Sequence, residues 1–159
     1  MIELNMIFSL GNLCVKIEIW DRNEKQFIET EALFDTGAHT THVDTDTLRR
    51  LGYDLDNAEK SYINSIGKRG MQVKNIAIDN IKIGDLELGA VSVNFSELSD
   101  INSPAVILGM NIIKEFNIEL DFTNRLISMK PNFDEQSAVS IDNFRKIDSR
   151  FGMWVMGAN

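Results

Sequence analysis

The sequence predicts an all-β domain that carries one or two short helices. Three observations support this prediction. Apolar residues alternate with polar ones over short segments, turn-forming residues recur about every eight to twelve positions, and helical signals are confined to short stretches. Many short strands that are separated in this way are typical of a closed barrel or a sandwich.

Composition limits the function classes. The 159 residues are 43% hydrophobic, enough for one domain with a real core. The net charge of −8 argues against nucleic acid as a partner, because no basic stripe is present to neutralise phosphates. No apolar run reaches membrane-spanning length and the first residues lack a secretory pattern, so we expect no membrane partner and a cytoplasmic location.

The first elements are two strands and a capped helix. Apolar residues alternate over 13–19, which predicts a strand with one buried face. Cys14, the only cysteine, falls on the opposite face, so we expect it to be partly exposed or at an interface, and not to form an internal disulfide. A second strand spans 26–34, and Asp44 or Thr45 is expected to cap a helix that ends before Gly52.

Hairpins fill the middle of the chain. Strand-like segments at 61–66 and 71–73 flank the glycine-punctuated turn 67–70. A further hairpin is expected over 81–88, with its turn at Gly84-Asp85. Apolar alternation over 91–95 predicts another strand.

The most informative segment is Asp35-Thr36-Gly37-Ala38, which follows the apolar end of the strand 26–34. A carboxylate beside a buried strand is costly unless it is paired, hydrogen-bonded or protonated. Thr36 offers a hydroxyl and Gly37 permits a tight turn with positive φ, so Asp35 can be held rigidly. This pattern indicates an acid presented for chemistry; a structural turn aspartate is the alternative.

A second element makes the motif more specific. Downstream, the apolar segment 105–108 is closed by Gly109, and a short helix over 110–116 and a strand over 118–122 follow. Together with the Asp-Thr-Gly-Ala turn, these segments resemble the retropepsin-like aspartic proteases over roughly residues 8–130. The resemblance implies an acid-protease barrel in residues 1–130 that works as a homodimer, because the chain has a single motif.

The resemblance also implies a mechanism. Asp35 from each of two copies would share one proton and activate a water for peptide-bond hydrolysis, with no cofactor. Thr36 would brace the two turns, and the Gly37 backbone would line a peptide or protein substrate. Ala38 stands where many pepsin-like enzymes carry Ser or Thr, which predicts activity at mildly acidic to near-neutral pH.

Substrate contacts are expected from two further segments. The hairpin around Gly67 resembles the flap of these enzymes, with Ile66 as an apolar contact at its tip; a plain surface hairpin is the alternative. Ile107 would belong to the wall beneath the Asp35 turn and reach a substrate side chain.

Other readings remain open. A non-catalytic peptide-binding or dimerisation module could keep the same fold. His39, His42, Asp44 and Asp46 could suggest a metal site, but the spacing lacks a recognised ligand pattern, so no metal is expected. Residues 131–159 are expected to form a C-terminal extension, partly helical because Ile141, Phe144, Ile147 and Phe151 fall at helical spacing.

Overall fold

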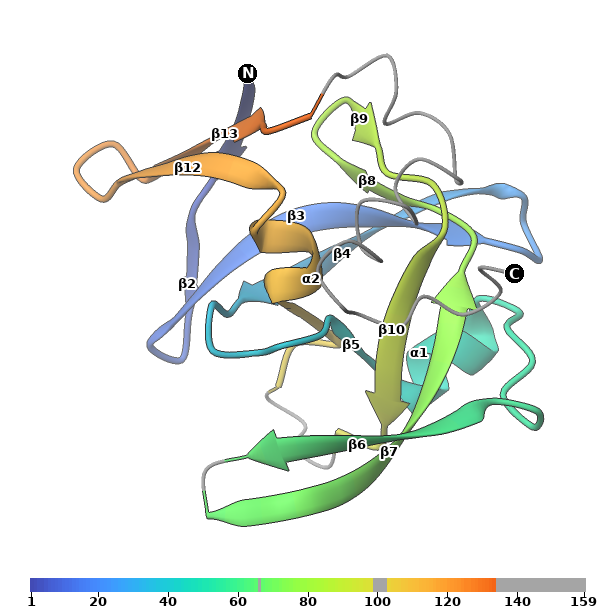
Figure 1. Cartoon of the computed structure of the whole chain (residues 1–159). Helices are drawn as coiled ribbons and strands as arrows, with labels where there is room; N and C mark the ends of the chain where they lie inside the picture. The colour runs from blue at the N-terminus through green and yellow to red at the C-terminus, as the bar shows by residue number, and fades with distance from the viewer. Residues whose placement is uncertain (66, 99–102, 134–159) are drawn as a thin grey trace.

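The computed structural model describes residues 1–65, 67–98 and 103–133, which form mainly β-strands with two short helices (Figure 1). The all-β prediction is confirmed. In chain order the elements are β1 (Ile2–Asn5), β2 (Ile7–Ser9), β3 (Asn12–Asp21), β4 (Gln26–Phe34), β5 (His42–Asp44), α1 (Thr45–Arg50), β6 (Glu59–Ser65), β7 (Lys68–Ile78), β8 (Ile81–Ile83), β9 (Leu86–Glu87), β10 (Val91–Ser96), β11 (Val106–Leu108), α2 (Met110–Ile113), β12 (Phe116–Asp121) and β13 (Leu126–Pro131).

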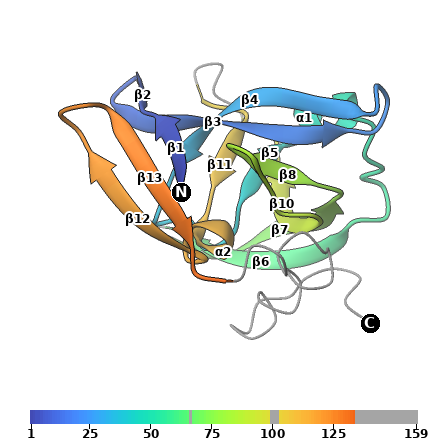
Figure 2. The same ribbon diagram turned by 90° about the horizontal axis from the view of Figure 1, so that it is seen from above.

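The described strands form two sheets. The larger sheet has the order β6-β7-β10-β5-β11-β4-β3-β8-β9, with β2 paired to β3, and the smaller has the order β1-β13-β12. Figure 2 shows the smaller sheet at one end of the larger one. At the centre of the larger sheet β4 pairs with β11 in parallel, and β11 pairs with β5 in antiparallel orientation.

One face of this central region is the hydrophobic core. The registers place Val15, Ala32, Val106 and Val43 in one row across β3, β4, β11 and β5. All four side chains are 0% exposed. Alternation along each strand sends the neighbouring residues to the other face, and that face positions the candidate site.

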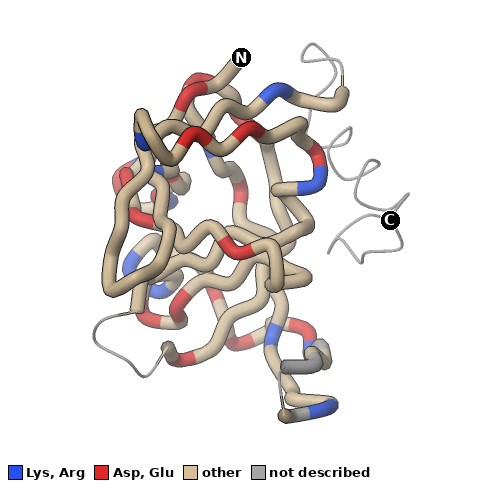
Figure 3. The backbone as a smooth tube through the Cα atoms, turned by 90° about the vertical axis from the view of Figure 1, so that its left-hand side faces the viewer, with Lys and Arg blue, Asp and Glu red and all other residues tan. Residues whose placement is uncertain are grey.

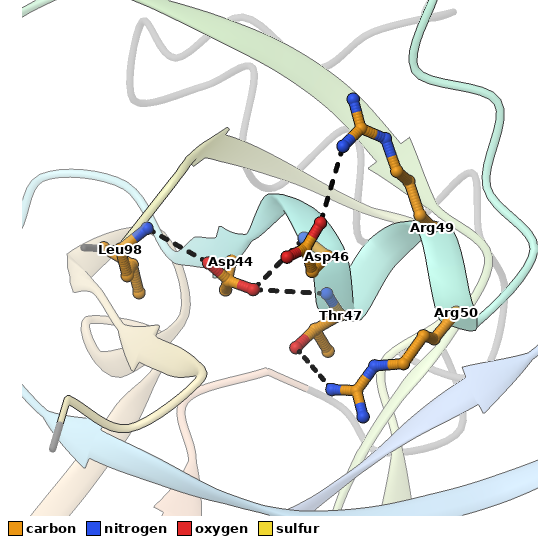
Figure 4. A network of polar contacts seen from close by, with 6 residues as sticks. All are labelled: Asp44, Asp46, Thr47, Arg49, Arg50 and Leu98. Atoms are coloured by element: carbon orange, nitrogen blue, oxygen red, sulfur yellow. Dashed lines mark hydrogen bonds and ion pairs between the residues drawn. The ribbon is translucent and has the colours of Figure 1, made fainter. Parts of the chain in front are cut away.

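Helix α1 begins where the sequence predicts. The carboxylate of Asp44 accepts hydrogen bonds from the backbone N–H groups of Asp46 at 3.1 Å and Thr47 at 3.3 Å (Figure 4). Its other oxygen accepts from the N–H of Leu98 at 3.0 Å. The helix ends before Gly52, whose φ of +82° suits a residue without a Cβ.

The structure corrects the expectation for Cys14, which is 0% exposed and not partly exposed. Its small side chain lies in a row between its cross-strand partners Ile7 and Leu33, and the Glu31 carboxylate contacts the thiol. Burial, with help from Glu31, raises the pKa of this thiol to about 11. The thiol of Cys14 therefore stays protonated near pH 7, and its role is to fill space in the interior.

Two strands, β1 and β2, were not predicted, and most of the predicted C-terminal extension lies outside the described residues. No strand is expected from the sequence pattern at β1 or β2, yet β1 pairs with β13 over four residues. The predicted helical extension lies outside the described residues, apart from its first residues: the N–H of Asn132 donates to the carbonyl of Glu115 at 2.8 Å.

Candidate active site

The Asp35 turn is attached directly to the segment that ends at Gly109. Asp35 follows the last residue of β4, and its N–H donates to the carbonyl of Leu108 at 3.1 Å. Beyond the strands, the N–H of Met110 donates to the carbonyl of Ala38 at 2.7 Å. The structure thus brings together the two segments on which the sequence analysis depends, although they are far apart in the chain.

Within the turn, the backbone orients the acid. The N–H of Gly37 donates to Oδ1 of Asp35 at 2.8 Å, and the N–H of Ala38 donates to the Asp35 carbonyl at 3.2 Å. Oδ2 of Asp35 has no partner among the described residues. Asp35 is half-buried, whereas Thr36 and Gly37 are exposed. One carboxylate oxygen is fixed and the other can act on a bound molecule.

The structure corrects the reason for a glycine at position 37. Its φ does not lie in the left-handed region, so the turn does not depend on positive φ. A Cβ on Gly37 would instead lie 3.1 Å from Oδ1 of Asp35, tighter than most such contacts. Gly37 therefore leaves room for the carboxylate to fold back over its backbone, and a Cβ there would push Oδ1 away by a few tenths of an ångström.

A second glycine allows a backbone-to-backbone contact behind the turn. A Cβ on Gly109 would lie 2.6 Å from the carbonyl carbon of Thr40 and 2.7 Å from the backbone nitrogen of Thr41. Only a residue without a side chain permits this approach. The N–H of Asn111 adds a hydrogen bond of 3.1 Å to the carbonyl of His39.

Buried polar groups surround this contact, and the sequence analysis missed them. The side-chain oxygen of Asn111 accepts from the N–H of Thr41 at 2.7 Å and from its hydroxyl at 2.8 Å. The Asn111 amide donates to the carbonyl of Ser92 at 3.0 Å, and the Ser92 hydroxyl donates to Asn75 at 2.7 Å. The side-chain amide of Asn75 donates to the side-chain oxygen of Asn94 at 3.0 Å. The backbone N–H of Asn94 donates to the carbonyl of Thr41 at 2.9 Å, which closes the ring.

These five residues, which we call the polar ring, link the segment just before β5 to α2, β10 and β7. Thr41, Ser92, Asn94 and Asn111 are at most 4% exposed. Because buried polar groups are costly unless they are hydrogen-bonded, a complete ring holds its members in one arrangement. The strand that leaves the Asp35 turn is thereby fixed.

The other predicted substrate-binding residues lie in different places. Ile107 is half-exposed in β11, next to the strand that ends at Asp35. Gly67 is exposed at the tip of the β6–β7 hairpin, with φ +78°, and Ile66 lies outside the described residues. Figure 1 shows this hairpin extending toward the same side of the molecule as the loop after β4.

The histidines and acids that could suggest a metal site do not converge. Asp44 is engaged as the cap of α1, and His39 is exposed. Nε2 of His42 lies 2.9 Å from the hydroxyl of Ser96. Burial lowers the pKa of His42 below its usual value, while the charge of Asp44 has a smaller, opposite effect. Within the described residues, no three His, Cys, Asp or Glu side chains are arranged to hold a metal ion.

Large apolar side chains are exposed near the turn. Phe8 in β2 is 48% exposed and stacks at a centroid distance of 6.5 Å on Phe122, which is 59% exposed. We call Phe8 and Phe122 the apolar patch; Leu10, two residues after Phe8, and Leu120, two residues before Phe122, are also exposed, at 73% and 42%. Only β3 separates β2 from β4, the strand that leads to Asp35. The view from this side shows acidic and basic residues scattered over the face (Figure 3).

Among the described residues, no helix has both the length and the apolar character that crossing a bilayer would require.

Comparison with known proteins adds to this geometry. Residues 23–115 match the sequence model of a family described as "gag-polyprotein putative aspartyl protease". The chain is also similar to the crystal structure of a retropepsin-like aspartic protease from Rickettsia conorii, with 17% identity and a TM-score of 0.58. That similarity covers 80% of this chain and 89% of the other, and it shows the fold. No curated protein is similar enough to count as a match.

Proposed function

Because this chain belongs to the gag-type aspartyl protease family and has a retropepsin-like fold, we propose that it is a homodimeric aspartic endopeptidase. The observation that carries the proposal is the Asp35 turn. One carboxylate oxygen is held by the Gly37 N–H at 2.8 Å, and the other is left without a partner among the described residues. The turn itself is bonded to the carbonyl of Leu108 and to the N–H of Met110, so this acid is held in a fixed place.

The proposed chemistry uses two copies of Asp35 that share one proton. The ionised carboxylate takes a proton from a water, and the water oxygen attacks the carbonyl carbon of the scissile peptide bond. The protonated carboxyl hydrogen-bonds the carbonyl oxygen as it gains charge. A proton then passes to the leaving nitrogen as the carbon–nitrogen bond breaks. Each Thr36, which is exposed in the single chain, would brace the two turns across the axis.

The apolar patch supports the homodimer. Large side chains such as Phe8 and Phe122 are rarely left together on the surface of a protein that works alone. Phe8, on β2, is separated from the Asp35-bearing strand by β3 only, so a second copy that covers the patch could also bring its own Asp35 near. A two-fold axis on this side would complete the site and bury the patch in one step.

Substrate contacts in this proposal come from both sides of the turn. Ile107 would contact a substrate side chain from the sheet, and the hairpin with Ile66 and Gly67 would close over the bound peptide. The open space around Gly67, where a Cβ would meet no atom within 4 Å, fits a tip that changes conformation. The alternative function, a non-catalytic peptide-binding or dimerisation module, would use the same surfaces without hydrolysis.

Replacement of the acid separates these two functions. Asp35→Asn keeps the shape and the Oδ1 acceptor for Gly37 but removes the proton exchange, so we expect cleavage of a peptide library to fall at least ~1,000-fold. Asp46→Asn is the matched control, since Asp46 is an exposed carboxylate on α1 whose ion pair in the described part of the chain is with Arg49 at 3.4 Å. Equal turnover by the native and Asp35→Asn proteins would exclude the protease mechanism.

A further inference from the structure

The sheet beside Asp35 presents a second row of side chains, on the face opposite the core row. The registers pair Ile107 with Leu33 on one side and with His42 on the other. Paired residues point to the same face, so Leu33, Ile107 and His42 share one row, which we call the outer row; beyond these three it continues to the buried residues Cys14 and Asn94. Each of the three is half-exposed, whereas the alternating residues of the core row are fully buried.

The outer row leads to the Asp35 turn. Asp35 follows β4 directly, two residues after Leu33, and its N–H donates to the carbonyl of Leu108 beside Ile107 at 3.1 Å. With strands about 4.8 Å apart and about 3.3 Å per residue, His42 lies roughly 12 Å from Asp35 between backbones. A substrate side chain one or two residues from the scissile bond can span this distance.

His42 is not a typical apolar member of this row. Its Nε2 lies 2.9 Å from the hydroxyl of Ser96, the last residue of β10. Its Nδ1 has no hydrogen-bond partner in the described part of the chain. The nearby Asp44 carboxylate is occupied by three backbone N–H groups, so it does not serve as the partner. The polar pair of His42 and Ser96, with one ring nitrogen unused within the described residues, therefore lies beside the aliphatic members of the outer row.

We propose that His42 and Ser96 recognise a carboxamide side chain, Asn or Gln, in the substrate close to the scissile bond. This inference rests on the proposed peptidase function and adds a substrate class to it. Leu33 and Ile107 contact the methylene groups of that side chain, and the imidazole and hydroxyl bind its amide.

The hydrogen-bonding groups of His42 and Ser96 favour a carboxamide side chain over other side chains. Burial holds the imidazole neutral near pH 7, so it offers one N–H donor and one acceptor, and a serine hydroxyl can do either. A carboxamide likewise carries both a donor and an acceptor, so it matches either tautomer. An aliphatic side chain would desolvate the pair without a hydrogen bond in return, and sites of this kind reject such analogues strongly.

Cleavage of a peptide library by His42→Val and by the native protein tests the proposal. Valine suits the strand and removes the polar pair. We expect the native protein to favour Asn or Gln over Leu at one substrate position. In His42→Val that ratio of kcat/KM should fall at least ~10-fold, while preferences at the other positions stay unchanged. Ser96→Ala, which leaves the imidazole in place, should reduce the ratio less.

A binding experiment tests this inference independently of whether the protein hydrolyses peptides. Selection of library peptides by Asp35→Asn and by the double variant Asp35→Asn/His42→Val needs no hydrolysis. Enrichment of Asn or Gln at one position by the first protein alone would support the inference, even if the native chain cleaved nothing. Identical enrichment by both proteins, or no bound peptide at all, would overturn it. Thermal unfolding of each variant confirms that the protein measured is folded.

Discussion

The Asp35 turn and the β6–β7 hairpin are both glycine-containing loops at the surface, but they are built in opposite ways. The turn is bonded to Leu108, to Met110 and, through His39, to Asn111, and Gly109 contacts its backbone behind it. At the hairpin tip, a Cβ on Gly67 would meet no atom within 4 Å. Glycine therefore permits close packing in one loop and an unusual backbone angle, with open space, in the other.

The difference suits the two proposed roles. A catalytic acid must be held within a fraction of an ångström of its working position, which requires support from rigid elements. A segment that covers a peptide must let it enter and leave, which requires few packed neighbours. The same substitution, Gly→Ala, should therefore have unequal effects at the two sites.

Gly109→Ala should have the largest effect. Its φ of −104° suits alanine, so the cost comes from the new Cβ, which must displace the backbone at Thr40 and Thr41. We expect a loss of about 3 kcal/mol or more in unfolding free energy, or roughly 6–12 °C in Tm. Thermal unfolding at a fixed protein concentration measures this, because association shifts Tm. A Tm within about 2 °C of the native value would show that the contact behind the turn is not tight.

Asn111→Ala should have the next largest effect, because it opens the polar ring. The buried N–H of Thr41 loses its acceptor at 2.7 Å, and the Ser92 carbonyl loses a donor at 3.0 Å. We expect a loss of about 2–3 kcal/mol in unfolding free energy, measured by urea denaturation. Catalytic activity should fall with it, because the strand after the Asp35 turn is less firmly held.

Asn23→Ala is the matched control for the ring. Asn23 is exposed, and its side-chain amide donates to the carbonyl of Arg50 at 2.8 Å. Loss of a hydrogen bond to a group that water can reach should cost under about 1 kcal/mol. Equal losses for Asn23→Ala and Asn111→Ala would contradict a special role for the ring.

The polar ring also shows where sequence-based prediction ends. Alternation over 91–95 correctly predicts β10, but Ser92 and Asn94 between its apolar residues are buried as well. A period of two identifies an apolar face and does not report whether the other face is covered. The same limit explains Cys14, which is buried and flanked within the sheet by residues of β2 and β4. Which strands flank which is a property of register, not of local sequence.

Part of the candidate site could likewise be predicted from local sequence, and part of it could not. Asp35, Gly109 and the hairpin at Gly67 carry local signals: an acid after an apolar run, a glycine that closes a strand, and glycines in a turn. His42 entered the sequence analysis only as a possible metal ligand. Its place in the outer row depends on the pairing with Ile107, and its bond to Ser96 joins residues 54 positions apart. Neither relation can be read from spacing along the chain.

Gly67→Ala should have the smallest effect on stability and so sharpens the comparison. The positive φ of +78° costs alanine about 1 kcal/mol or less, and the new Cβ displaces nothing. Gly11→Ala is its matched control, because Gly11 also has open space and a φ of +81° but lies in the β2–β3 turn. Both variants should lose a similar, small amount of unfolding free energy, while only Gly67→Ala should lower kcat/KM, by roughly 3–10-fold, if that hairpin closes over the substrate. A stability loss at Gly67 as large as that at Gly109 would mean that the hairpin is a packed structural element, and the contrast between the two loops would then disappear.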